Sequence, residues 1–233
     1  MTDAPTMPEF DLPRRLAAEA IGTAILLAGI VGSGIMAERL AGGNEAIALL
    51  ANMAATGAIL AVLILVFGPI SGAHFNPAVT VSFVMQRALR PGTAAAYIAV
   101  QIVAALVGVA LAHLMFDEPL VQAAVKTRSG PGIWAAEVVA TAGLVATIIG
   151  CLRFRPEAVA YAVGLYISAG YWFTASTSFA NPAVTIGRAF TDSFTGIRAA
   201  DAPAFIVAEM VGAVAATLVF RWLLADRRND PDV

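Results

Sequence analysis

The sequence predicts an all-α membrane protein with six transmembrane helices, two re-entrant half-helices and an inverted internal repeat. Apolar stretches of about 20 residues recur along the chain, and each can cross a hydrocarbon core of roughly 30 Å. Of the 233 residues, 59% are hydrophobic and only 13% are charged, and the mean hydropathy is +0.80. Soluble domains carry about a quarter charged residues, so most of this chain does not face water. The motif NPAVT occurs twice, at 76–80 and at 181–185.

The apolar stretches define six predicted spans, because glycine, proline and charged residues separate them. The whole chain, 1–233, is expected to form one transmembrane domain. Its first half covers about 15–115 and its second half about 132–224. The spans lie near 15–37, 45–67, 93–115, 132–151, 157–175 and 202–224.

The cationic residues predict the orientation of the chain. An even number of spans places both termini on one side, and cytoplasmic segments carry the excess of cations. One side has Arg14, Arg15, Arg87, Arg90, Arg153, Arg155, Arg221, Arg227 and Arg228, and the other has Arg39, Lys126, Arg128, Arg188 and Arg198. Nine against five predicts cytoplasmic termini. The single lysine beside thirteen arginines suggests a GC-rich bacterium and hence its inner membrane.

The chain contains two related halves. AAEAIGTAILLA at 17–28 aligns without gaps to AAEVVATAGLVA at 135–146, which pairs Glu19 with Glu137. Three spans separate equivalent points, and because this number is odd the second copy must be upside-down relative to the first. Inverted repeats of this kind place a transport pathway at the interface between the halves, near the membrane midplane.

Each NPA motif has the local sequence of a helix start. Asn is a preferred N-cap residue, and Pro is favoured at the first helical position. Each segment is too short and too polar to be a further span, so we expect it to dip into the membrane as a half-helix. Such backbone is tolerated only inside protein or against a water-filled cavity. The motif residues are Asn76, Pro77, Ala78, Asn181, Pro182 and Ala183.

The junction of the two half-helices is expected to select solutes by charge. Because the repeat is inverted, the half-helices should meet N-terminus to N-terminus. Two positive dipole ends, each equivalent to about half a charge, oppose metal ions and protons there. The side-chain amides of Asn76 and Asn181 can donate hydrogen bonds to a passing hydroxyl. The sequence therefore predicts a pathway for small neutral solutes.

Several segments resemble the aquaporin family, the major intrinsic proteins. The resemblance rests on AEAIGT in the first span, SGAHFNPAVT in the first dip, YIAVQIVAALVG in the third span and FANPAV in the second dip. It implies an aquaporin-like fold, a passive channel rather than an enzyme, and a homotetramer in membrane lipid with one pore in each protomer. It also implies that Glu19 and Glu137 accept hydrogen bonds from the dipping loops and so buttress the NPA motifs.

The residue after the second NPA motif departs from the family pattern. Most members have an arginine there, which forms a narrow outer filter with an aromatic residue, whereas this chain has Val184. Ungapped spacing from the two asparagines assigns Thr56, Ala169 and Ser178 to the other filter positions. Such a constriction would be small, neutral and without an aromatic wall. The replacement resembles a bacterial subgroup linked to arsenic-resistance operons, which implies passage of arsenite, antimonite, methylarsenicals, glycerol-type polyols and water.

Two further polar residues near the motifs have more than one interpretation. Arg188 lies four residues beyond Val184, about one helical turn further out. It is either a displaced filter arginine in the outer vestibule or a surface residue that pairs with Asp192. His74 either lines the cytoplasmic half of the pore or braces its own loop.

The remaining functional classes are weighed by what the sequence lacks. The net charge of -2, without a basic run, gives no footprint for nucleic acid, and no motif indicates a cofactor. His74, His113 and Cys151 do not have metal-ligand spacing, and no nucleophile–base pattern indicates an enzyme. An ion-coupled secondary transporter also uses inverted repeats and broken helices, but it would need further intramembrane charges. A water-selective aquaporin is the alternative within the channel class.

Overall fold

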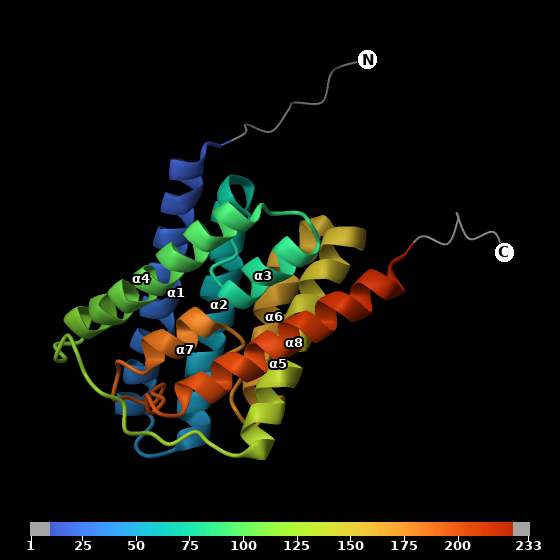
Figure 1. Cartoon of the computed structure of the whole chain (residues 1–233). Helices are drawn as coiled ribbons and strands as arrows, with labels where there is room; N and C mark the ends of the chain where they lie inside the picture. Colours follow the sequence, from blue (N-terminus) through green and yellow to red (C-terminus); the bar gives the residue numbers. More distant parts are fainter. Residues whose placement is uncertain (1–9, 226–233) are drawn as a thin grey trace, which may run out of the picture.

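The computed structural model describes residues 10–225, and the regular elements in this range are helices (Figure 1). Arg227 and Arg228, which contribute to the predicted orientation, lie outside the described residues. The helices are α1 (Leu12–Leu40), α2 (Glu45–Ser71), α3 (Pro77–Met85), α4 (Pro91–Met115), α5 (Pro131–Phe154), α6 (Val159–Phe173), α7 (Pro182–Arg188) and α8 (Ala202–Leu223), and a 3₁₀ turn, η1 (Pro156–Ala158), precedes α6. Six long helices and two short ones agree with the predicted fold class.

The two halves pack in the same way and run in opposite directions. In Figure 1, α1 and α5 traverse the bundle in opposite senses. Helix α1 packs mainly against α4 and α2, and α5 packs mainly against α8 and α6. The repeat therefore relates α1 to α5, α2 to α6, α3 to α7 and α4 to α8.

Glycines allow the long helices to approach closely at their crossings. A β-carbon added to Gly108 on α4 would overlap the carbonyl oxygen of Ala24 on α1. One added to Gly212 on α8 would overlap the carbonyl oxygen of Val138 on α5. Small residues at such crossings let backbones touch, which is the usual basis of helix packing in membranes.

The outer faces of the long helices are apolar and suited to lipid. Within residues 10–225, five helices, α1, α2, α4, α5 and α8, are long and apolar enough to cross a membrane. Their exposed side chains include Ile21, Val62, Val103, Val139 and Val207. Helix α6 has 15 residues, which gives a length of roughly 22 Å, and η1 extends it at one end.

Two helix boundaries differ from the predicted spans because of local backbone geometry. Helix α2 continues through Pro69 and ends where Gly72 adopts a left-handed conformation with φ of 89°, a common helix stop. Helix α6 begins only after the 3₁₀ turn and ends before Thr174, whose backbone is extended. Helix α2 therefore extends four residues beyond the predicted span 45–67, whereas η1 and α6 together match the predicted span 157–175 to within two residues at each end.

Candidate functional site: a central cavity at the junction of two half-helices

The two NPA motifs begin α3 and α7 in the way their sequences predict. Asn76 is the N-cap of α3, and its Oδ1 accepts a hydrogen bond of 2.8 Å from the N–H of Ala78. Asn181 is the N-cap of α7, and its Oδ1 accepts one of 3.0 Å from the N–H of Ala183. The first helical positions are Pro77 and Pro182.

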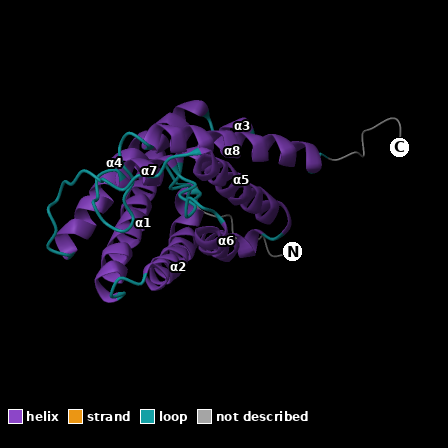
Figure 2. Ribbon diagram, turned by 90° about the horizontal axis from the view of Figure 1, so that it is seen from below, coloured by secondary structure: helices purple, strands orange, loops and turns teal. Residues whose placement is uncertain are grey.

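The same two asparagines tie the two re-entrant loops together. Asn76 Nδ2 donates to the carbonyl oxygen of Ala180 at 2.7 Å, and Asn181 Nδ2 donates to that of Phe75 at 2.8 Å. The half-helices therefore meet start to start, and Figure 2 shows loop segments inside the group formed by α2, α5, α6 and α7. Each amide keeps a second N–H, and both asparagines line the central cavity.

The loops reach the junction through an unusual backbone shared by both halves. Ala73 and Ser178, each three residues before an NPA asparagine, have φ of 48° and 52°. Phe75 and Ala180, each directly before one, have φ of 49° and 50°. Residues other than glycine rarely adopt this left-handed region, so surrounding contacts must hold it in place.

Glu19 supplies those contacts in the first half. It lies on α1 and is fully buried. Its Oε1 accepts hydrogen bonds from Ser71 Oγ at 2.7 Å and from the N–H of His74 at 2.9 Å. Its Oε2 accepts from the N–H of Phe75 at 2.8 Å and from Gln101 Nε2 at 2.9 Å. A buried carboxylate with four donors is well satisfied, and it fixes the loop as a buttress would.

In the second half, two carboxyl groups accept the corresponding hydrogen bonds. Glu137 on α5 accepts hydrogen bonds from the N–H groups of Phe179 and Ala180 at 2.9 Å and 2.8 Å. Glu209 on α8 accepts one of 3.2 Å from the N–H of Asn181 and one of 2.6 Å from Thr185 Oγ1. Both glutamates are fully buried. The family resemblance implied this role for Glu137, and Glu209, at a similar point of the last span to Gln101 in the third, contributes in the same structural way.

A cavity of about 420 Å³ passes along the junction of the half-helices. Its wall contains both NPA asparagines and five other residues that the sequence singled out. These are Thr56, His74, Ser178, Val184 and Arg188. Spans, half-helices and loops far apart in the chain thus converge on one space.

Ala169 is the assigned filter residue that the structure does not bring to this cavity. Its side chain is exposed on the outer face of α6, and it is not among the cavity-lining residues. The lining face of α6 instead carries Val163, Ile167 and Tyr171, spaced four residues apart. Tyr171 donates a hydrogen bond of 3.2 Å to Thr56 Oγ1. The expectation that the cavity wall has no aromatic residue at this level is therefore wrong. The spacing of four residues between Val163, Ile167 and Tyr171 on α6 is the sequence signal that would have identified Tyr171.

Arg188 is buried, contrary to its interpretation as a surface residue. Its Nε donates to the carbonyl oxygen of Thr195, and its guanidinium carbon lies 3.4 Å from the centroid of the Phe179 ring. Asp192, the partner expected for a surface arginine, instead accepts a hydrogen bond from the N–H of Val125. A cation so close to an aromatic face gains stability from the ring quadrupole. Arg188 therefore lies in the cavity wall one turn beyond Val184.

A second buried arginine supports this wall from the loop between α4 and α5. Arg128 donates to the carbonyl oxygens of Gly196 at 2.9 Å and Ser176 at 3.3 Å. Its guanidinium carbon lies 5.1 Å from the centroid of the Phe179 ring. Burial lowers the pKa of Arg128 to about 10, so that the side chain stays charged at neutral pH. Sequence spacing gave no signal for this contact.

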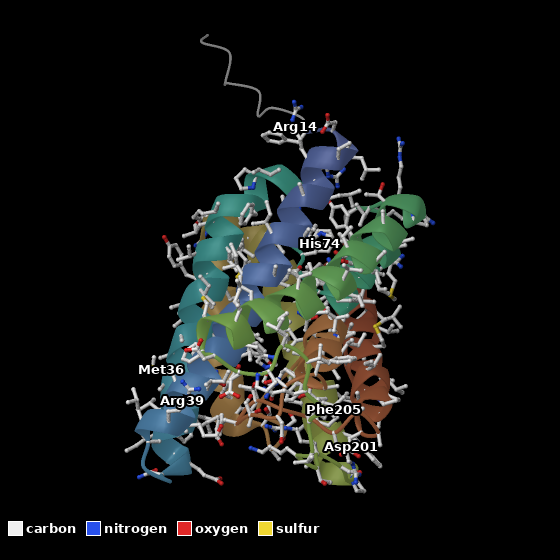
Figure 3. All side chains as sticks on the ribbon, turned by 90° about the vertical axis from the view of Figure 1, so that its left-hand side faces the viewer. Arg14, Met36, Arg39, His74, Asp201 and Phe205 are labelled. Carbon is white, nitrogen blue, oxygen red and sulfur yellow. The ribbon has the colours of Figure 1, made fainter. Side chains whose placement is uncertain are left out.

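His74 both lines the cavity and braces its loop. The ring nitrogen Nδ1 is 3.1 Å from Thr80 Oγ1, and the ring packs against Phe83 with centroids 4.3 Å apart. Figure 3 shows His74 between Arg14 and Arg39, which mark opposite ends of α1. The two interpretations of His74 are thus compatible.

The cavity combines apolar walls with a few fixed donors. Apolar lining residues include Leu26, Ile30, Leu60, Ile64, Val79 and Leu144. The amides of Asn76 and Asn181 and the guanidinium of Arg188 supply hydrogen-bond donors. The starts of α3 and α7 face this region, and their dipoles disfavour cations. The arrangement suits a small neutral molecule with hydroxyl groups.

Comparison with known proteins identifies one protein family over most of the chain. The family model described as major intrinsic protein matches residues 7–154 and 152–231. The chain belongs to the major intrinsic protein family. It is 55% identical over 222 residues to aquaglyceroporin AqpS of Rhizobium meliloti (strain 1021), with 95% of each chain covered. It is also 36% identical over 105 residues to probable aquaporin NIP5-1 of Arabidopsis thaliana, which covers 45% of this chain and 33% of that relative.

A solved structure of an aquaglyceroporin has the same fold. The aquaglyceroporin from Plasmodium falciparum superposes with a TM-score of 0.74 at 21% identity, covering 90% of this chain and 96% of that one. The predicted membership of the major intrinsic protein family is confirmed. The protein is accordingly an integral membrane channel for small solutes and not an enzyme.

Proposed function

We propose that the protein is a passive channel for glycerol-type polyols and for neutral trivalent arsenic and antimony hydroxides, together with methylarsenicals and water. It acts as a homotetramer in a bacterial inner membrane, with one pore in each protomer and both termini cytoplasmic. The similarity to a rhizobial aquaglyceroporin supports the class of solute. The family resemblance supports the tetramer, and the excess of arginines supports the orientation.

The observation that carries the proposal is that Val184 lies in the wall of the cavity. This residue stands where most family members have the filter arginine, and its side chain lines the cavity. The cationic donor lies one turn further out, at Arg188, so that it does not constrict the same level of the pore. A polyol or an arsenic trihydroxide presents several hydroxyls, which can reach the donors of Asn181 and Arg188 in succession.

A water-selective aquaporin is the competing function, and Tyr171 is the observation that favours it. Its ring lines the cavity, and its hydroxyl is bonded to Thr56. An aromatic residue at this level narrows the pore and disfavours larger solutes. Water and polyol fluxes must therefore be measured on the same vesicles.

Stopped-flow light scattering on proteoliposomes tests the proposal. We expect rapid glycerol and arsenite uptake by the wild type and a reduction of roughly tenfold or more in Val184→Arg, which corresponds to about 1.4 kcal/mol. Val184→Leu keeps the site neutral and should reduce uptake less, so the pair separates charge from bulk. Val184→Phe tests bulk alone if the additional arginine prevents insertion.

Three results would contradict the proposal in different ways. Fast water flux without solute uptake would identify a water-selective pore, with Tyr171 as the limiting residue. Solute accumulation driven by a proton or sodium gradient would identify an ion-coupled transporter. Equal arsenite and glycerol uptake by the wild type and Val184→Arg would show that the filter lies elsewhere.

A further inference from the structure

The internal repeat extends to α4 and α8 and places Glu209 opposite Gln101. YIAVQIVAALVG at 97–108 aligns without gaps to FIVAEMVGAVAA at 205–216, and Gln101 and Glu209 share one column. Four residues after the two NPA asparagines, Thr80 and Thr185 also correspond. The structure preserves this equivalence, because Gln101 Nε2 is 3.1 Å from Thr80 Oγ1 and Glu209 Oε1 is 2.6 Å from Thr185 Oγ1.

The two halves differ in which group can donate a proton at this point. In the first half, the amide of Gln101 donates to Glu19, and one anionic carboxylate is sufficient. In the second half, Glu137 and Glu209 are both fully buried and hold consecutive N–H groups of one loop, Glu137 those of Phe179 and Ala180 and Glu209 that of Asn181. Glu209 Oε2 is buried and receives no hydrogen bond from an N–H or O–H donor within residues 10–225. Two carboxylates cannot form a hydrogen bond unless one of them holds a proton.

The charged and titratable groups nearest this pair are Arg188, Arg128 and Tyr166 on α6, and the two arginines act on the carboxyl groups through their positive charge. Helix α3, which packs against α8, has no titratable side chain. Helix α7 contributes Arg188, whose Nε is committed to the carbonyl oxygen of Thr195. The preceding loop contributes Arg128, which donates to carbonyl oxygens. Neither arginine is within ion-pair distance of the two carboxyl groups among the described residues.

We propose that Glu209 and Glu137 form a buried proton-binding site that holds the second NPA loop, with one shared proton in place of the Gln101 amide. Glu209 is then a positioning residue, since it acts through Asn181 and Thr185 rather than on the solute. Loss of the proton at alkaline pH places two anions side by side in a low-dielectric site. Their repulsion separates the groups that hold Phe179 and Asn181, and solute flux falls.

Infrared spectroscopy of the reconstituted full chain tests the proton directly, independently of any solute. We expect a carbonyl-stretch band of a protonated carboxylic acid at neutral pH in the wild type. The band disappears on alkaline titration and is absent in Glu209→Gln, which restores an amide at this position. Gln101→Glu is the matched variant in the first half, and it should add a second band. If Glu209→Gln fails to insert, Glu209→Asp serves instead by shifting the band frequency.

Flux measurements test the consequence for the channel and rest on the proposed function. The readout is the ratio of glycerol flux at alkaline pH to that at neutral pH, so that a change in basal flux cancels. This ratio should fall several-fold in the wild type, stay near one in Glu209→Gln, and fall again in Glu209→Gln/Gln101→Glu. A wild-type spectrum without a protonated carboxyl band at neutral pH would overturn the proposal even if glycerol flux is normal. A band that is unaltered by Glu209→Gln and Glu209→Asp would also overturn it.

Discussion

The first and second halves of the molecule share one backbone design but present different side chains at the two mouths of the cavity. Two residues before its NPA asparagine, the first half has His74, which packs against Phe83 seven residues after that asparagine. At the same two positions the second half has Phe179 and Arg188, again in contact. Each half thus stacks an aromatic ring at this level, and only the second adds a permanent cation.

The midplane junction and the mouths are under different physical constraints. The two asparagines bond across the junction, so each half must reproduce the geometry that the other requires. At the mouths, His74 packs against Tyr97 of α4 and Phe179 packs against Phe205 of α8, and neither contact joins the two halves. Their chemistry can diverge, and the cation of the second half gives the pore its polarity.

The largest effect should come from removing the carboxyl anchors, and it should be unequal. Glu19→Leu removes an acceptor from four buried donors, of which Gln101 Nε2 keeps Thr80 Oγ1, whereas Glu137→Leu removes an acceptor from two. An unpaired buried polar group costs about 1–3 kcal/mol, so Glu19→Leu should abolish folded protein and Glu137→Leu should lower its thermal stability. Loss of the monodisperse peak on heating in detergent measures both.

A matched control sets the scale for the anchor experiment. Glu38 on α1 accepts a hydrogen bond from the N–H of Phe194 at an exposed site, so Glu38→Leu should change the melting temperature little. Equal destabilisation by Glu19→Leu and Glu137→Leu would show that the two anchors are equivalent and that the halves do not differ in how they hold their loops.

The helix crossings should respond equally in the two halves. Gly108→Ala and Gly212→Ala each insert a methyl group against a backbone carbonyl oxygen, and we expect each to cost about 1–3 kcal/mol, as overpacking usually does. Gly150→Ala is the control, because its nearest neighbour is an ordinary 3.7 Å contact with Phe220. Melting temperatures in one detergent report all three. If only one of the two variants has a lower melting temperature, the helices at the other crossing can move apart without loss of stability.

Sequence patterns among neighbouring residues predicted the helices of this protein and their starts. Apolar length indicated the long helices, and the Asn-Pro sequence indicated both the N-caps and the first turns of α3 and α7. These features depend on residues that are neighbours in the chain. The inverted arrangement followed from counting spans between the two copies, and the structure confirms it.

Residues whose position depends on loops were harder to place. Counting back from Asn181 assigned Ala169 to the filter. The intervening chain has left-handed backbone at Thr177 and Ser178, so the number of residues along the chain does not determine which residue of α6 reaches the cavity wall. Arg188 was ambiguous because its partners, Phe179 and the carbonyl oxygen of Thr195, come from outside its own helix. Such contacts are set by tertiary structure, and a helical period alone does not contain them.

The smallest effect should be electrostatic, at the mouth where the two halves differ. Arg188→Met removes the cation from the cavity wall and should raise cation leak. Two unit charges at roughly 4 Å in water interact by about 1 kcal/mol, so we expect an increase of about fivefold. A potential-sensitive dye in proteoliposomes measures the leak. Arg188→Lys keeps the charge and should show no increase, and Phe83→Met changes the equivalent position of the first half without changing charge. A rise of equal size in Phe83→Met would mean that packing at either mouth excludes cations. The cation of the second half would then not be the cause.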